Sequence, residues 1–342
     1  MVSDLPFPKS LPDFQRLFPD DAACAKYLET IRWRMGFVCP SCNEAREPGR
    51  ISTRPHVLRC RACRKETRLM AGTIMQDSHT SMSVWFWGAY LLTSMTPGMS
   101  AVQFQRQLGL TRYETAFQIL HKLRSGMVRP NRDRIGGKLP VEVDETYVGG
   151  KTRGEGKGVH HGIVVAGAVE VCTRKPSDKV GKAAPRRGGR YAGRLRLSVV
   201  PNRSGKSLCR FVDDSVEETT MVVTDDWKGY SGLAERGYDH LPVAERGSAQ
   251  VAEDYLPLIH LVFSNLKSWI VGVHHGVEPQ HLQAYLNEFT FRFNRRFYPF
   301  NSFRSLLGIA SDAESPTYDE LYSGTHVHTG EYRETATSAS TG

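Results

Sequence analysis

The spacing of hydrophobic and polar positions changes several times along the chain, and each change predicts a boundary. The apolar residues first recur at helical spacing, then give way to a short basic stretch of strand-like character, and later return to helical spacing. Proline and glycine breakers then predict a linker. The predicted segments are an N-terminal helical segment (1–35), a cysteine-containing ribbon (36–76), a helical module (77–128), a linker (129–138), a larger domain (139–310) and a C-terminal tail (311–342), disordered from about residue 323.

The larger domain shows strand and helix patterns in a definite order. In LPVEVDETYV (139–148), apolar residues alternate with Glu142 and Asp144, which is the period of a strand. The order of strand, strand, strand, helix, strand and helix is that of an RNase H-like α/β core, so we expect this fold class. The later elements are strands at 162–171, 193–200 and 220–225, a helix within 207–218, and a long helix from about residue 255.

Four of the seven cysteines form two close pairs. CPSC supplies Cys39 and Cys42, CRAC supplies Cys60 and Cys63, and residues 43–59 separate the pairs. Two C-x-x-C pairs at this separation present four thiolates to one tetrahedral zinc ion and leave no open position for catalysis. We therefore predict a structural zinc ribbon in a reducing compartment.

Basic residues near the cysteines and a net charge of +9 favour an anionic partner, with nucleic acid first. We expect Arg61 and Arg64 to contact DNA, although a solvated basic face is the alternative interpretation. A short amphipathic helix then ends at Gly109 and a second follows from Thr111, which resembles a helix-turn-helix. Many helical hairpins share that pattern, but beside a basic ribbon it favours DNA binding.

Two acids of the larger domain lie at the ends of predicted strands. Asp144 ends the first strand, and Asp225 and Asp226 end the fourth, in TMVVTDDWKGY. The first and fourth strands of an RNase H-like sheet are neighbours, so Asp144 and Asp225 should converge. Carboxylates so placed suit Mg²⁺ or Mn²⁺, and two such ions about 4 Å apart support phosphodiester chemistry. Turn or capping carboxylates are the structural alternative for either acid alone.

The long helix from about residue 255 carries a histidine and a lysine on one face. His260 and Lys267 are two helical turns apart. We expect His260 to bind the metal and Lys267 to reach a phosphate, although a lone histidine on such a helix is more often structural. Downstream, NEFTFRFNRRF places Glu288, Arg292 and Arg295 on one helical face. The arginines either face DNA, oriented by Glu288, or merely stabilise the helix.

Eight segments together resemble one family. The chain is similar, from about residue 12 to about 310, to DDE transposases of bacterial insertion sequences that carry an N-terminal zinc ribbon and an ISXO-like catalytic domain. The segments are CPSC, CRAC, AGTIMQDS, FQRQLGL, VEVDETYVGGK, TDDWKGY, VFSNLKSWIVGVHHGV and HLQAYLNEFTFRFNRR.

The resemblance implies a metal-dependent recombinase that cuts at the ends of its element and joins the 3′-ends to target DNA. It assigns the first two catalytic acids to Asp144 and Asp225, because the family pattern T-D-x-W-x-G-Y leaves Asp226 at a variable place. The third position and its following lysine fall on His260 and Lys267. The downstream signature falls on Glu288, Arg292 and Arg295.

Two features depart from the family pattern. A histidine stands where many relatives have a carboxylate, so Glu253 and Asp254 are alternative third ligands. The basic segment 173–193 also looks longer than a hairpin loop of this fold needs.

The partners implied are double-stranded DNA, as inverted repeats and target, and a second copy of the chain, since transposition pairs two ends. There is no apolar run of about 18 residues and no apolar signal region, so we expect no membrane contact and a cytoplasmic, nucleoid-associated bacterial protein. The alternatives are a catalytically silent, repurposed DNA-binding relative and a zinc-ribbon nuclease that acts on RNA–DNA hybrids.

Overall fold

The computed structural model describes residues 5–54, 56–129, 132–149, 162–174, 189–243 and 255–326. These residues fall into two compact units. The first is built from residues within Met1–Pro130 and Arg295–His328, and the second from residues within Asn131–Asn294. No helix in these ranges combines the length and the apolar character that a bilayer span requires.

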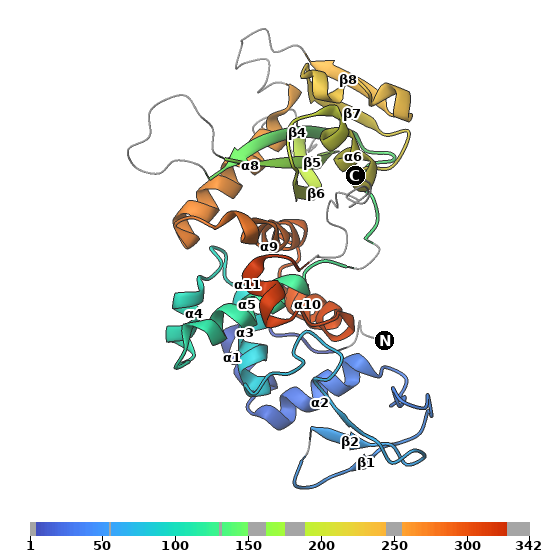
Figure 1. The fold of residues 1–342 in the computed structure, drawn as a ribbon, viewed down its shortest axis with the longest axis vertical. Helices are drawn as coiled ribbons and strands as arrows, with labels where there is room; N and C mark the ends of the chain where they lie inside the picture. The colour runs from blue at the N-terminus through green and yellow to red at the C-terminus, as the bar shows by residue number, and fades with distance from the viewer. Residues whose placement is uncertain are drawn as a thin grey trace, which may run out of the picture. The chain divides into compact units, whose positions relative to one another are not determined.

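The first unit contains a small antiparallel sheet and a set of helices (Figure 1). The first two helices are capped by the preceding polar residues: Ser10 accepts a hydrogen bond from the backbone of α1, and Asp20 does the same for α2. The elements are α1 (Leu11–Leu17), α2 (Asp21–Arg32), β1 (Gly49–Arg50), β2 (Val57–Arg59), β3 (Glu66–Arg68), α3 (Met82–Ser94), α4 (Ala101–Gln107), α5 (Tyr113–Ser125), α10 (Phe300–Asp312) and α11 (Tyr318–Ser323).

The C-terminal helices complete this first unit, which the sequence pattern did not predict. Phe303 of α10 packs its ring against Phe14, Phe18 and Phe86, with centroids 5.5–6.1 Å apart. α11 begins with a capping box and lies within the expected tail. The expected boundary at residue 310 therefore cuts through α10. A contact between residues nearly 300 positions apart leaves no periodic signal in the sequence.

The second unit is built on a five-stranded sheet in the order β6-β5-β4-β7-β8 (Figure 1). β4 (Val141–Val148), β5 (Ile163–Thr173) and β6 (Arg190–Val199) are antiparallel neighbours. β7 (Met221–Asp225) runs parallel to β4, and β8 (Asp239–Val243) runs parallel to β7. The mixed α/β class predicted from the sequence is confirmed.

Two hydrophobic clusters cover the two faces of this sheet. One contains residues of α6 (Gly205–Ser215) and inward-facing residues of β4 such as Val141 and Val143. The other contains residues of α8 (Pro257–Trp269) and α9 (Leu282–Asn294). Because both faces are buried, polar residues of the central strands lie against helices.

The expected order of elements is present with one addition. The structure contains β8, which the sequence analysis missed because its five residues, DHLPV, include Pro242 and lack a clear alternation. Proline removes a backbone donor and is tolerated mainly in edge strands, and β8 ends the sheet within the described residues. The basic segment is also shorter at both ends than expected, since β5 extends to Thr173 and β6 begins at Arg190; residues 175–188 lie outside the described residues.

Candidate functional site

The four paired cysteines converge on one point of the ribbon. The sulfur atoms of Cys39, Cys42, Cys60 and Cys63 all lie within 4.8 Å of one another. The Cys39–Cys63 and Cys42–Cys60 sulfur atoms are each 3.7 Å apart. Four thiolates at about 2.3 Å from a tetrahedral zinc ion would be about 3.8 Å apart, so this donor set fits zinc.

The two cysteine pairs share one backbone geometry. The amide following the first pair, at Asn43, donates to the carbonyl of Cys39, and the amide of Arg64 donates to that of Cys60. Asn43 and Arg64 both have positive φ, 58° and 66°. Each chain reversal therefore turns two thiolates to the same side, which is why both pairs reach one ion. The predicted structural zinc ribbon is supported in both ligands and shape.

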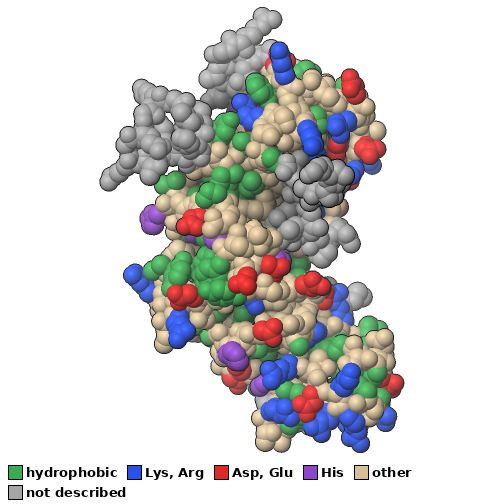
Figure 2. All heavy atoms as spheres, viewed as in Figure 1, with side chains coloured by type: hydrophobic (Ala, Val, Ile, Leu, Met, Phe, Trp, Pro, Cys, Tyr) green, Lys and Arg blue, Asp and Glu red, His purple; other side chains and the backbone are tan. Residues whose placement is uncertain are grey.

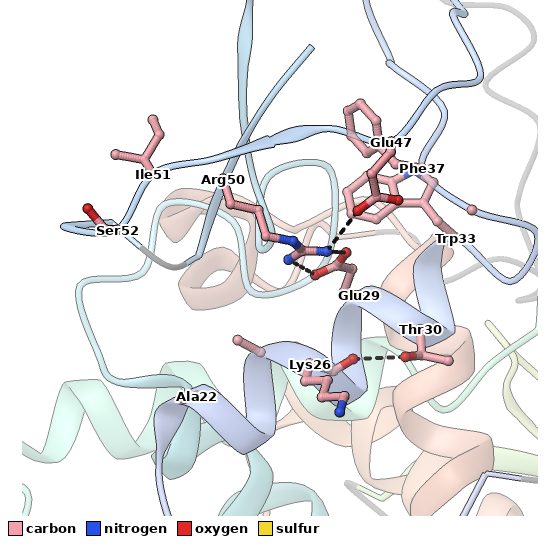
Figure 3. Close-up of a pocket in the computed structure, with 12 residues that line it drawn as sticks. Ala22, Lys26, Glu29, Thr30, Trp33, Phe37, Glu47, Arg50, Ile51 and Ser52 are labelled. Carbon is pink, nitrogen blue, oxygen red and sulfur yellow. Dashed lines mark hydrogen bonds and ion pairs between the residues drawn. The ribbon is translucent and has the colours of Figure 1, made fainter. Parts of the chain in front are cut away.

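The basic side chains of the ribbon differ in their partners. Arg54 and Arg59 pair with Glu66, and Arg50 pairs with Glu29 of α2 through two hydrogen bonds of 3.0 and 2.7 Å (Figure 3). Figure 2 shows Lys and Arg side chains gathered over this part of the first unit. In the described part of the chain, the exposed Lys and Arg side chains of the ribbon with no ion pair are Arg46, Arg61, Arg64, Lys65 and Arg68.

The helical pair α4 and α5 has the turn that the sequence predicted. Gly109 lies in the left-handed region with φ 60°, and the amide of Leu110 donates to the carbonyl of Gln105. Tyr113 and Glu114 at the start of α5 are exposed, but Phe117 packs its ring 5.0 Å from that of Tyr322 in α11. DNA contact by this module stays a prediction.

Asp144 and Asp225 share one register on neighbouring parallel strands. Val141 pairs with Val222 and Glu142 with Val223, an offset of 81 residues (222 − 141). Asp144 and Asp225 have the same offset (225 − 144), two residues beyond the last pair. Asp225 ends β7 as predicted, but Asp144 lies inside β4 and not at its end, because the strand continues through the polar residues to Val148. Residues at one register level of a parallel pair point to the same side of the sheet, with strands about 4.8 Å apart. The two acids therefore lie at the same level on adjacent strands.

The adjacent acids Asp225 and Asp226 have different environments. Asp225 is the last residue of β7, is half-buried, and accepts a hydrogen bond of 3.2 Å from the amide of Trp227. Asp226 lies in the following bend and is exposed. The choice of Asp225 over Asp226 as a metal ligand stays a prediction.

His260 lies directly beside Asp144. Its Nε2 atom is 3.2 Å from Oδ2 of Asp144, whose side chain is 13% exposed. Two cis ligands of an octahedral ion at about 2.1 Å would be about 3.0 Å apart, so the pair fits a shared divalent cation. Lys267 is exposed two turns further along α8. Glu253 and Asp254, the alternative ligands, lie outside the described residues.

The three expected ligands do not form a closed set in this structure. Among the described residues, the cysteine quartet is the only group of three or more potential ligands whose atoms lie within 4.8 Å of one another. The structure therefore places Asp144 against His260, and Asp144 level with Asp225, without bringing all three ligand atoms together.

A buried network that the sequence analysis missed connects the two acid-bearing segments. Glu145, whose side chain is 1% exposed, accepts hydrogen bonds from Arg203 and from the hydroxyl of Tyr230. Burial, followed by the charge of Glu145, raises the pKa of Tyr230, so its hydroxyl stays protonated and donates. The Arg203 guanidinium lies 4.3 Å from the ring centre of Trp227, whose Nε1 donates to the carbonyl of Arg203. The signal available in the sequence was Glu145 itself, an acid inside a strand pattern.

The downstream acid and arginines are largely enclosed. The Glu288 side chain is fully buried, and Arg292, 16% exposed, lies 3.4 Å from it. Burial lowers the pKa of Arg295 to about 10, with Arg129 adding to the effect. This geometry resembles the helix-stabilising alternative more than an open phosphate contact, because little of Arg292 remains accessible.

Two family models match the chain. One, described as an ISXO2-like transposase domain, matches residues 135–294, and one described as a transposase zinc-ribbon domain matches residues 19–66. The first match includes Asp144, Asp225 and His260, and the second includes all four paired cysteines. No curated protein and no solved structure matches the chain significantly.

Proposed function

Because the chain belongs to the insertion-sequence transposases that combine a zinc ribbon with an ISXO2-like transposase domain, we propose that it cuts DNA at the ends of its element and joins the 3′-ends to target DNA. The observation that carries this proposal is the common register of Asp144 and Asp225, with His260 beside Asp144. An RNase H-like core is supported by three antiparallel strands followed by two parallel ones.

Asp144, Asp225 and His260 are the residues that would hold Mg²⁺ or Mn²⁺. Their donors are two carboxylates and an imidazole, and carboxylate oxygen is the preferred ligand of these hard cations. When bound, the metal would activate a water or a 3′-hydroxyl and stabilise the leaving oxygen of the phosphodiester. The protein supplies two neighbouring internal strands, β4 and β7, that fix the spacing of the two acids before DNA arrives.

Cationic residues have two proposed roles. Exposed Lys267, two turns from His260 on α8, would contact a DNA phosphate near the cleaved bond. Arg61 and Arg64 of the ribbon, both exposed, would contact the backbone of the element end. Glu288 keeps a supporting role through Arg292, and direct DNA contact by Arg292 and Arg295 is the less favoured part of the proposal.

Pairing two element ends requires two copies of the active site, so we expect a dimer or larger assembly on DNA. Binding to chromosomal DNA would place the protein at the nucleoid. The zinc ribbon would contribute to end recognition and not to the chemistry, since its four thiolates complete the coordination of the ion.

The experiment is a cleavage and strand-transfer assay. The full chain is incubated with DNA carrying the sequences that flank its gene, with a target plasmid, and with Mg²⁺ or Mn²⁺. We expect free 3′-hydroxyl ends and joined products that require the metal. Specific binding without cleavage at any metal concentration would contradict the enzymatic proposal and favour the silent DNA-binding alternative.

A further inference from the structure

The start of α8 is capped by a side chain from the sheet and not by its own preceding residue. Leu256 occupies the N-cap and has no side-chain acceptor, and Pro257 at the first helical position has no N–H. The next two amides, of Leu258 and Ile259, donate to one oxygen of Glu142, at 2.8 and 2.9 Å. A carboxylate at a helix N-terminus satisfies these donors and complements the helix dipole.

This cap is adjacent to the candidate site at both ends. Glu142 lies two residues before Asp144 on β4, so the two side chains point to the same face of the sheet. His260 directly follows Ile259 on α8, and its Nε2 atom lies 3.2 Å from Asp144. β4 and α8 are therefore in contact at two places that are two residues apart on β4. Glu142 caps the helix, and Asp144 lies beside His260.

The close approach of α8 to the sheet has a second cause in β5. Gly167 pairs with Asp144, and a Cβ atom added to it would lie 2.8–2.9 Å from Phe263 and Ile259 of α8. The atoms in the way are the ends of these two side chains, so a larger residue at this position would displace them. Gly167 thus leaves room for Phe263 and Ile259 against β5, and the Glu142 cap fixes the start of α8 against β4.

Burying the carboxylate of Glu142 costs more free energy than a cap needs if its only role is to stabilise α8. The residue is 1% exposed, and its second carboxylate oxygen is buried without a hydrogen-bond partner in the described part of the chain. A serine or aspartate at residue 256 would provide a cap worth about 1 kcal/mol without burying a charge. Sliding α8 by one residue would move His260 about 1.5 Å along the axis and about 100° around it, away from Asp144.

We propose that Glu142 is a positioning residue: by capping α8 it holds His260 against Asp144. This inference rests on the proposed function only in treating His260 as part of the site. Glu142 itself does not touch the reacting atoms.

The first test needs no metal and no DNA. The test follows the ring proton on Nε2 of His260: held 3.2 Å from Oδ2 of Asp144, which shields it from water, it should exchange slowly enough to be seen by NMR of the full chain labelled with ¹⁵N-histidine. We expect the signal in the wild type and in E142Q, whose amide oxygen still accepts, and its loss in E142A. E170A is the matched control, because Glu170 is a buried β5 carboxylate that also accepts backbone N–H groups but lies outside this cap. Absence of the signal in the wild type, or its retention in E142A, would overturn the proposal.

The second test measures Mn²⁺ affinity by electron paramagnetic resonance. E142A should weaken Mn²⁺ binding about tenfold, as loss of a residue that orients a ligand does, and E142Q should recover most of the affinity. In a protein that already lacks the imidazole, H260A, adding E142A should change affinity little, whereas additive losses would contradict action through His260. Absence of Mn²⁺ binding by the wild type would contradict the proposed function, and the ring-proton result would still decide the role of Glu142.

Discussion

The hydroxyl of Tyr230 donates a hydrogen bond to the carboxylate of Glu145 inside the second unit, and this contact joins the two segments that carry the candidate acids. Glu145 follows Asp144 on β4, and Tyr230 lies five residues after Asp225. Tyr230 is 0% exposed. The contact therefore fixes the turn after β7 against β4, next to the level where the two acids stand.

Replacing Tyr230 by Phe should destabilise the protein, because one carboxylate oxygen of the buried Glu145 then loses its hydrogen-bond donor. We expect a loss of about 1–3 kcal/mol in the free energy of unfolding, measured by urea denaturation. Tyr238→Phe is the matched control, since that hydroxyl makes longer contacts of 3.3 and 3.4 Å to Asp213 and Val216. Equal losses in the two variants would show that the Glu145 contact carries no special weight.

Removing zinc should unfold the ribbon and leave the second unit folded. The ribbon has three strands of two or three residues each, so the metal must supply much of its stability. Chelation should expose the amides of residues 36–76 to hydrogen exchange, and Cys39→Ser should do the same. Cys209→Ser, in α6, serves as the control for a buried cysteine outside the quartet. Loss of exchange protection in β4–β7 on chelation would contradict the separation of the two units.

The salt dependence of DNA binding should depend on the unpaired arginines of the ribbon. The double variant Arg61→Ala with Arg64→Ala should reduce the slope of log affinity against log salt by about 2, one for each lost phosphate contact. Arg54→Ala with Arg59→Ala removes the same charge from side chains already paired with Glu66 and should change the slope less. Fluorescence anisotropy at several salt concentrations measures both; a larger effect from the paired arginines would refute the assignment.

Glu170 should make stability depend on pH. Burial alone would raise the pKa of Glu170, but hydrogen bonds from Arg194 and from the Gly136 amide outweigh it and hold the pKa below its ordinary value. A lowered carboxyl pKa contributes stability that is present above the pKa of the unfolded chain and is lost as pH falls through the folded value. Glu170→Gln should therefore lose less stability than the wild type on acidification from about pH 5 to about pH 3. Exposed Glu218, mutated to Gln, is the control, and an unchanged pH dependence in Glu170→Gln would disprove the linkage.

The sequence predicted those features that depend only on residues close together in the chain. The two C-x-x-C pairs, the alternation around Asp144 and the β-branched run before Asp225 each specify a short geometry, and the structure has each of them. The assignment of Asp225 over Asp226 also needed the family pattern, because both residues follow the same strand.

Features that depend on tertiary packing were not predictable in this way. The alternation of Glu142 and Asp144 with apolar residues predicts a strand but not what covers its polar side, and helices cover both faces so that Glu142 is buried. Phe303 joins a core formed by residues near the N-terminus, and no periodicity reports such a contact. β8 is short and contains Pro242, so only its pairing with β7 identifies it.

The most direct test of the account compares two adjacent acids in the strand-transfer assay. Asp225→Asn keeps the shape of the side chain but removes the proposed metal-binding charge, and Asp226→Asn makes the same change in the exposed bend. We expect Asp225→Asn to lower the strand-transfer rate about a thousandfold, because losing the metal-binding charge removes several kcal/mol of transition-state stabilisation. The strand-transfer rate of Asp226→Asn should stay within about threefold of the wild-type rate. Strand transfer that survives in Asp225→Asn, or that falls equally in Asp226→Asn, would contradict the proposed active site.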